Sequence, residues 1–458
     1  MMKRQVNMDY FIEMEKRIPK GRTRTRFAPS PTGYMHVGGL RTALYAYLIA
    51  KMDGGQFILR IEDTDQGRYV EGATEIIYKT LLDAGLVYDE GPDRGGSVGP
   101  YTQSERREIY HKYAERLIEL GGAYIKDDEP GVVRQKIPAD GSTSFTDTLF
   151  GEVTISNSEL DEGVLIKSDG MPTYNFANVI DDHLMGITHI VRGTEYLTST
   201  PKYNLLYEAF GWDIPVYIHV SPVMKNAAQK LSKRNGDPTY DDLLEMGYLK
   251  EAVLNYVALL GWSPGGEREI FSLKELEETF NVSGLSKSPA IFDMEKLTWL
   301  NGEYIRALSS DRFYELALPY IKRYIKREVD SREVALMVQS RCGRLTDIRE
   351  LTDFIDELPE YSKELFVHKK MKTDVESSIG TLRHIYDALS ALDEWTAESV
   401  HTSMTALVAE LGLKNGQVLF PLRVAVSGKE STPAGGTELC ALLGKEESLK
   451  RIAKAVGL

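Results

Sequence analysis

The sequence predicts an α/β fold in which a parallel sheet is followed by a helical C-terminal third. Two observations support this prediction. Residues 23–61 read as strand, loop, helix and strand, a unit whose parallel strands are joined by a right-handed crossover. Beyond Asp237 the apolar residues recur almost wholly at helical spacing, and residues 311–458 read as one helix after another. An α/β part and an all-helical C-terminal third are therefore expected.

The first strand leads into a loop that ends at the start of a helix. Residues 29–33 (Pro-Ser-Pro-Thr-Gly) cannot continue a sheet, because proline has no backbone N–H and glycine permits positive φ. His36, Gly38 and Gly39 stand where the helix begins, and the free N–H groups and the dipole of a helix start favour a phosphate. A histidine there can donate to a phosphate oxygen as charge develops. This segment predicts a phosphate-binding site.

The helix that follows has an apolar stripe, and Gly54 and Gly55 are expected to end it. Residues 56–61 are predicted to form the second strand. The ligands of such sheets lie beyond the carboxyl ends of the strands. The stripe consists of Leu40, Ala43, Leu44, Tyr47 and Leu48, with the polar Lys51 at its end.

A small cationic loop, residues 230–234, follows much later in the chain. Its two lysines suit the stabilisation of phosphate charge from a loop flexible enough to close. Alone, the loop is much better explained as a solvated surface turn. The phosphate-binding interpretation depends on the upstream loop.

Together these segments resemble the bacterial-type glutamyl-tRNA synthetases, a family of class I aminoacyl-tRNA synthetases. Gly39 stands where the general class I pattern has a second histidine, and Leu231 and Arg234 are variants of the usual Lys-Met-Ser-Lys-Ser loop. The resemblance covers most of residues 23–310 and continues weakly in the C-terminal third. Its segments, in the order of the family, are residues 27–33, 36–39, 60–65, 99–106, 167–183 and 230–234.

The resemblance implies a glutamate–tRNA ligase that uses ATP, L-glutamate and tRNA(Glu). It implies a Rossmann-like class I synthetase catalytic domain with an inserted α+β module and an all-helical anticodon-binding region. The implied catalytic residues are His36, Lys230 and Lys233. The implied ATP-binding residues are Ala28, Pro29, Ser30, Gly33, His36, Gly38, Gly39 and Lys233. The implied glutamate-binding residues are Arg26, Ser30, Glu62, Tyr174, Asn178 and Arg192. Arginine suits this task because its planar fork matches a carboxylate; Arg192 could instead form a salt bridge with Glu195 on the same segment.

No protein metal ligand is predicted. ATP brings Mg²⁺, which phosphates and water largely hold. The two cysteines, Cys342 and Cys440, lie far apart, whereas a structural zinc site needs four clustered ligands. Residues 124–145 replace a longer stretch in typical members, some of which carry zinc there, so no structural zinc is expected. Four aspartates could suggest a metal pair, but the first two are expected to brace the arginines or cap a helix: Asp63, Asp65, Asp181 and Asp182.

The resemblance also implies a division of the chain into domains. The N-terminal extension reads as one helix with Tyr10, Phe11, Met14 and Ile18 on one face. The expected order is the extension at 1–22, the first half of the catalytic domain at 23–101, a shortened acceptor-end-binding module at 102–170, the second catalytic half at 171–236, a helical stem-contact domain at 237–310 and the helical anticodon-binding region at 311–458.

Composition and charge bear on membrane insertion, on localisation and on nucleic-acid binding. The chain has 458 residues with 42% apolar content, and it has no apolar run long enough for a membrane span. No secretory cleavage pattern follows the N-terminus, so a cytoplasmic enzyme is expected. The enzyme is also expected to be a monomer. The formal charge of −13 argues weakly against nucleic acid, but binding depends on local basic patches. Residues 322–327 and 368–372 are candidate patches for tRNA, or simply solvated helix faces.

Three other functions stay open at this point. The nearest is a glutaminyl enzyme, and another is a truncated paralogue that glutamylates a modified tRNA base. The helical C-terminal third argues against truncation. An inactive tRNA-binding paralogue is the alternative from a different class, and the presence of His36, Lys230, Lys233 and Arg26 argues against it. The sequence does not reveal whether tRNA(Gln) is also charged.

Overall fold

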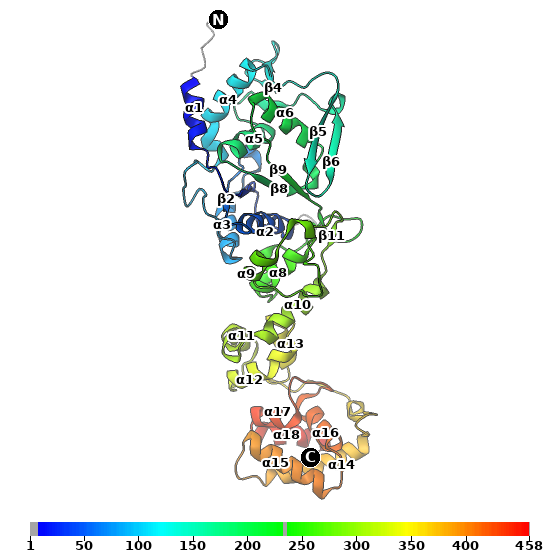
Figure 1. Cartoon of the computed structure of the whole chain (residues 1–458). Coiled ribbons are helices and arrows are strands. Elements are labelled where there is room, and N and C mark those ends of the chain that lie inside the picture. The colour runs from blue at the N-terminus through cyan, green and yellow to red at the C-terminus, as the bar shows by residue number, and fades with distance from the viewer. Residues whose placement is uncertain (1–7, 232–235, 458) are drawn as a thin grey trace. The chain divides into compact units, whose positions relative to one another are not determined.

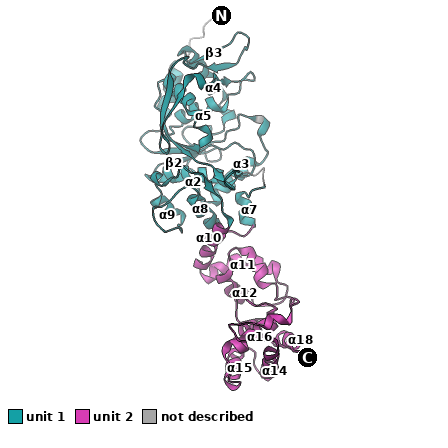
Figure 2. Ribbon diagram, turned by 90° about the vertical axis from the view of Figure 1, so that its right-hand side faces the viewer, with its two compact units in different colours: residues 1–245, 250–294 teal, residues 246–249, 295–458 magenta. Residues whose placement is uncertain are grey.

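A computed structural model describes residues 8–231 and 236–457 of the chain. Its contacts divide the chain into two compact units (Figure 2). Unit 1 comprises Met1–Glu245 and Lys250–Met294, and unit 2 comprises Met246–Leu249 and Glu295–Leu458. No described helix is both long and apolar enough to cross a bilayer.

Unit 1 begins its sheet with the predicted strand, loop, helix and strand. Strand β1 (Arg24–Phe27) pairs in parallel with β2 (Gln56–Leu59), and α2 (Val37–Lys51) connects them. Strand β2 ends two residues before the predicted boundary, because the Ile61 N–H donates its hydrogen bond to the Tyr101 carbonyl and not to β1. Gly55 is required at the entry to β2, since a Cβ there would lie 2.1 Å from the Thr23 carbonyl oxygen.

A four-stranded sheet has the order β6 (Gly151–Ser156), β5 (Ser142–Asp147), β9 (Val216–Val220) and β8 (His189–Gly193). Strands β5 and β6 are antiparallel, whereas β5–β9 and β9–β8 are parallel. The hairpin β5–β6 falls in the predicted inserted module, yet it extends the sheet formed by β8 and β9 (Figure 1). The insertion therefore contributes directly to the sheet that carries Arg192.

Two smaller sheets complete the strands in the described part of unit 1. One is the antiparallel sheet of β3 (Ala123–Ile125), β4 (Val133–Gln135) and β7 (Val164–Ile166), and the other pairs β10 (Val223–Met224) with β11 (Ala290–Ile291). The remaining helices are α3 (Ala73–Asp83), α4 (Arg107–Glu119), α5 (Tyr174–Leu184), α6 (Thr200–Phe210), α7 (Tyr240–Glu245), α8 (Lys250–Leu259) and α9 (Leu273–Thr279).

The N-terminal extension forms a helix, α1 (Met8–Arg17), as the apolar spacing predicts. Phe11 is buried, and its ring meets Tyr113 of α4 edge-on with the centroids 5.0 Å apart. Glu15 lies 2.8 Å from the ring of His183, which stacks on Trp212 at 3.7 Å. The extension is thus part of the core around α4 and α5 (Figure 1).

The described part of unit 2 is built from helices, as predicted. Cys342 and Cys440 are both buried there as free thiols. The helices are α10 (Met294–Ala307, which begins at the last residue of unit 1), α11 (Ser310–Tyr324), α12 (Ser331–Val338), α13 (Ile348–Thr352), α14 (Val375–Ser390), α15 (Ala397–Glu410), α16 (Asn415–Ser427), α17 (Gly436–Leu443) and α18 (Lys445–Val456).

Candidate active site

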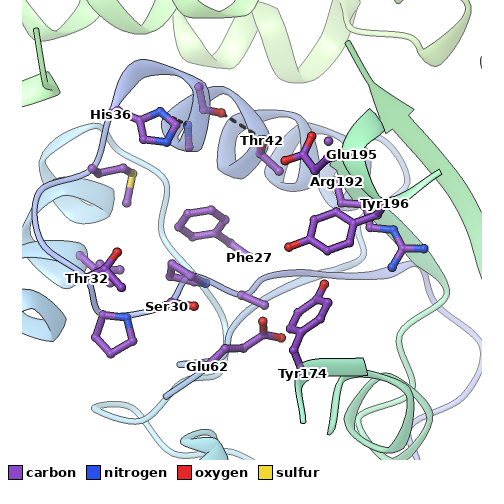
Figure 3. A pocket seen from close by; sticks show the side chains of 18 of the residues that line it. Phe27, Ser30, Thr32, His36, Thr42, Glu62, Tyr174, Arg192, Glu195 and Tyr196 are labelled. Carbon is purple, nitrogen blue, oxygen red and sulfur yellow. Dashed lines mark hydrogen bonds between the residues drawn. The ribbon is translucent and has the colours of Figure 1, made fainter. Parts of the chain in front are cut away.

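A cleft of about 870 Å³ opens in unit 1 at the carboxyl ends of β1, β2, β8 and β9. This is the place where parallel sheets bind ligands, and the volume suits a small-molecule site. Figure 3 shows His36 and Thr42 on one side of the cleft and Glu62 and Tyr174 on the other. Most of the predicted site residues line it: Arg26, Ala28, Pro29, Ser30, Gly33, His36, Gly38, Gly39, Glu62, Tyr174, Arg192 and Lys230.

His36 caps the start of α2 at one end of the cleft, the end predicted to bind phosphate. Its Nδ1 accepts a hydrogen bond of 3.2 Å from the Gly39 backbone N–H, so the proton of the neutral ring lies on Nε2. The pKa of His36 is lowered, first by partial desolvation in the cleft and then by the positive charge of Lys230. A neutral ring with a free Nε2–H can donate to a phosphate oxygen.

Gly38 and Lys230 complete this end of the cleft. A Cβ on Gly38 would lie 3.1 Å from Cε1 and Nδ1 of His36, so glycine leaves room for the imidazole. Lys230 follows β10, and its Nζ lies 3.8 Å from the Glu195 carboxylate, with both side chains more than half exposed. Lys233, the second lysine of the cationic loop, lies outside the described residues.

A network of buried charges lies beneath the opposite end of the cleft. Arg26 is 4% exposed and donates from Nε and Nη2 to the two carboxylate oxygens of Asp182, at 2.9 and 3.1 Å. Arg60 donates from Nη1 to Asp182 at 2.7 Å and from Nη2 to Glu62 at 3.1 Å. Burial alone would raise the pKa of Asp182, but the two arginines hold it below its ordinary value. Asp182 therefore orients one predicted glutamate ligand directly and a second through Arg60.

This geometry shows which carboxylates pair with the buried arginines. Asp182 pairs with Arg26 and Arg60, and Asp181 pairs with Arg60 and Arg106. Asp63 accepts a hydrogen bond from the Ser104 backbone N–H at 2.8 Å, at the start of the short helical turn that leads into α4, in keeping with the expected capping role. Asp181 and Asp182 lie on α5, far along the chain from β1, so no local pattern indicated them as partners of the arginines. Among the described residues, no group of three His, Cys, Asp or Glu side chains is arranged to hold a metal ion.

Glu62 is the carboxylate that lines the cleft at this end. Burial raises its pKa to about 7, although the charges of Arg60 and Arg26 oppose the shift. Its charge is thus poorly compensated by the protein alone. An ammonium group bound in the cleft would favour the ionised form.

Arg192, at the end of β8, is 5% exposed. Its Nε donates to His219 Nε2 at 3.0 Å, and its Nη2 donates to Thr200 Oγ1 at 2.7 Å. Nη1 is buried and has no hydrogen-bond partner among the described residues. These hydrogen bonds run away from Glu195, the salt-bridge partner considered from sequence, and they leave one buried donor for a ligand.

Two tyrosines face each other next to Arg192. The rings of Tyr174 and Tyr196 have centroids 5.3 Å apart, and the Arg192 guanidinium lies 5.4 Å from the Tyr196 ring centre (Figure 3). Asn178, one turn after Tyr174 on α5, is 2% exposed and donates to the Tyr174 carbonyl at 2.7 Å. It is absent from the described cleft wall, so Asn178 is the described site residue that the structure does not bring to the cleft.

Sequence reasoning missed several polar residues of the cleft wall, among them Tyr196, Arg68 and Lys167. Lys167 donates to the Thr64 carbonyl at 3.3 Å, which ties the segment before α5 to the segment after β2. A signal was available for Tyr196, since it follows Arg192 by four residues. Arg68 stands in a short 3₁₀ turn whose pattern gave no such signal.

Comparisons with known proteins identify the class of protein. Residues 22–131 and 125–299 match the family model described as tRNA synthetases class I (E and Q), catalytic domain. Residues 312–456 match the model described as anticodon binding domain. Together with the parallel sheet and its cleft, these matches place the chain among the class I aminoacyl-tRNA synthetases.

Individual relatives narrow the assignment. The glutamate–tRNA ligases of Clostridium botulinum (strain Loch Maree / Type A3) and Clostridium kluyveri are each 55% identical over 471 aligned positions, which cover 94% of this chain and 97% of the relative. A crystal structure of a glutamate tRNA ligase from Elizabethkingia meningosepticum, in complex with its amino acid, matches with a TM-score of 0.85 at 34% identity, over 95% of this chain and 99% of that one. The chain belongs to the glutamate–tRNA ligase family, which confirms the predicted family and fold class.

Proposed function

We propose that the cleft activates L-glutamate with ATP and that the enzyme then transfers the glutamyl group to the 3′ end of tRNA(Glu). In the first step a carboxylate oxygen of glutamate attacks the α-phosphorus, the bond to the bridging oxygen of the β-phosphate breaks, and pyrophosphate leaves. In the second step the terminal ribose hydroxyl attacks the acyl carbon, loses its proton, and AMP leaves. The observation that carries this proposal is one cleft with a phosphate-type helix start at one end and buried Arg and Glu side chains at the other.

The phosphate end is proposed to bind ATP through the loop at 28–33 and the start of α2. The Nε2–H of His36 and the ammonium of Lys230 would donate to phosphate oxygens. Lys233 is proposed to act with them as charge moves to pyrophosphate. Mg²⁺ would arrive with ATP, held largely by phosphates and water, and would offset phosphate charge.

The opposite end is proposed to bind glutamate. Arg26 and Arg192 are the cations for its carboxylates, and Glu62 is the acceptor for its ammonium. Ser30 and Tyr174 line the same wall, and Asn178 would contribute only after its side chain turns from the Tyr174 carbonyl. The unpartnered Nη1 of Arg192 supports this assignment, because a buried donor without an acceptor is costly until a ligand supplies one.

Exchange of radiolabelled pyrophosphate into ATP, with and without tRNA, tests the choice of amino acid. Glutamate is expected to support exchange and glutamine is not, since a neutral amide would leave arginine charge unpaired in a buried site. Exchange supported equally by glutamine would overturn this pocket assignment.

Three further expectations remain predictions. The helical unit 2 is proposed to contact tRNA(Glu), in keeping with its anticodon-domain match. A monomeric, cytoplasmic enzyme is expected, and sedimentation velocity tests its oligomeric state. No stoichiometric zinc is expected after chelator treatment, and elemental analysis that found about one equivalent would contradict this.

A further inference from the structure

Three neighbouring strands bring together a carboxylate, an imidazole and Arg192. Arg192 on β8 is in register with His219 on the adjacent strand β9. Asp147 ends the next strand, β5, opposite Tyr217 of β9. The side chains of Asp147 and His219 are fully buried, and neither residue lines the cleft.

The hydrogen bonds define the state of the imidazole. An arginine N–H can only donate, so His219 Nε2 accepts from Arg192 Nε at 3.0 Å. The proton of the neutral ring is then on Nδ1, 2.8 Å from Asp147 Oδ2, which accepts it. Burial lowers the pKa of His219, which keeps the ring neutral although Asp147 opposes the shift.

Asp147 is itself fixed by backbone donors. Its Oδ1 accepts from the N–H groups of Leu149 and Phe150 at 2.9 and 2.8 Å, and its Oδ2 accepts from the His219 N–H at 3.0 Å. Burial would raise the pKa of Asp147, but these hydrogen bonds and that of the His219 ring lower it below its ordinary value. An ionised, immobile acceptor therefore sets the tautomer of His219.

The result is a guanidinium with a single orientation. Nε and Nη2 are taken by His219 and Thr200, and the rings of Tyr196, Tyr203 and Tyr217 lie 5.4, 4.8 and 5.2 Å from the guanidinium carbon. Only Nη1 lacks a partner among the described residues. A rotated guanidinium would lose both hydrogen bonds, so the surroundings select which donor is left for a ligand.

We propose that Asp147 and His219 are positioning residues for amino-acid binding, which fix the tautomer and the orientation that leave Arg192 Nη1 free for a glutamate carboxylate. The proposal rests on the proposed function, in which Arg192 is a glutamate ligand. It assigns a role in the amino-acid pocket to a strand of the inserted module, a segment expected only to contact tRNA.

A matched pair of amide variants tests this role. In His219→Gln the side-chain carbonyl can reach the place of Nε2 and accept from Arg192, whereas in His219→Asn the shorter amide reaches only toward Asp147. Aminoacylation with tRNA present gives kcat and the KM for each substrate, and calorimetry gives glutamate affinity. Melting temperatures establish that the variants fold, and Ser144→Ala, an exposed position on β5, is the control.

In His219→Asn the KM for glutamate is expected to rise about tenfold to a hundredfold, as for the loss of one hydrogen bond to a charged group. The KM for ATP should stay within about twofold, because the lost interaction concerns only one substrate. His219→Gln should recover most of the loss. Asp147→Asn should resemble His219→Asn, since an amide donor forces the imidazole proton toward Arg192.

Equal effects of Asn and Gln, a parallel rise in both KM values, or no change in folded variants would each overturn the positioning role. Arg192→Lys separates this failure from that of the proposed function. If Arg192→Lys leaves the glutamate KM unchanged, the assignment of Arg192 as a ligand is wrong. If it raises that KM while both His219 variants bind glutamate normally, only the positioning role is wrong.

Discussion

Asp182 joins the two arginines beneath the amino-acid end of the cleft, and Asp182→Asn is the sharpest test of this buried network. The side chain of Asp182 is fully buried and receives three arginine hydrogen bonds of 2.7–3.1 Å. Asparagine has the same shape but removes the charge and replaces one acceptor oxygen by a donor. Arg26 and Arg60 would then be left buried with Glu62 and Asp181 as the remaining counter-charges.

Removing one partner of a buried ion pair typically costs about 3–5 kcal/mol. We expect Asp182→Asn to lower the free energy of local unfolding of unit 1 by an amount near the lower end of that range. The loss is not larger because Arg60 retains two other carboxylates. Asp161→Asn is the matched control. Asp161 pairs with Lys202 at 2.7 Å but its side chain is 75% exposed, and such surface pairs contribute about 0–1 kcal/mol.

Native-state hydrogen exchange followed by mass spectrometry measures this loss locally. Peptides from α5 should exchange at least about a hundredfold faster in Asp182→Asn, and peptides from α14 in unit 2 should not change. The lowered pKa of Asp182 determines whether stability rises or falls with pH. Its stabilisation is present above the pKa of an unfolded aspartate and is lost as pH falls through the lower folded value, so the variant should be less sensitive to acid over that range. A change below about 1 kcal/mol in α5 would refute the reasoning.

Three other predictions concern substrates. Lys233→Ala should slow adenylate formation by about a hundredfold or more with a smaller change in ATP affinity, and a rate within about threefold of the parent in single-turnover kinetics would contradict its role. Because the pKa of Glu62 is about 7, its protonation should raise the KM for glutamate as pH falls through that value; a parent pH profile as flat as that of Glu62→Gln would count against an ionised acceptor for the ammonium. Replacing Lys369, Lys370 and Lys372 by Ala should weaken tRNA binding and flatten its log–log salt dependence by up to about two units. Unchanged affinity and slope would mark this cluster as a solvated face.

The loop and helix start at the proposed phosphate end of the cleft could be predicted from the sequence, because they are built locally. Proline and glycine end β1, and His36 caps the helix ten residues after Arg26. The remaining donors are backbone N–H groups of the helix start. The helix α1 was predictable for the same reason, since the spacing of its apolar residues is a local pattern. Such features depend on neighbours within one or two turns.

The pairing within the charge network could not be predicted, because its partners are remote in sequence. Arg26 and Asp182 lie 156 positions apart, and no pattern near Arg26 indicates which carboxylate faces it. Asp63 and Asp65 are nearer and have the same chemistry, so local reasoning considered them for bracing the arginines or for capping a helix. Likewise, no pattern within β5 indicates that this strand lies beside β9.

One end of the cleft is built from local contacts and the other from contacts remote in sequence. Mutations at the two ends should therefore have different effects. His36 is exposed and its ring accepts one hydrogen bond, as the cap of α2, so its replacement should lower the reaction rate and cost only about 1 kcal/mol of stability. Arg26 is buried and tied to Asp182, so its replacement should weaken glutamate binding and destabilise unit 1 together. The proposed amino-acid site is therefore coupled to the stability of the core, whereas the proposed phosphate site is coupled to it only weakly. Changes of amino-acid specificity in this scaffold should then require compensating substitutions around α5 and β9, remote in sequence from the loop at 28–33 that is proposed to bind ATP.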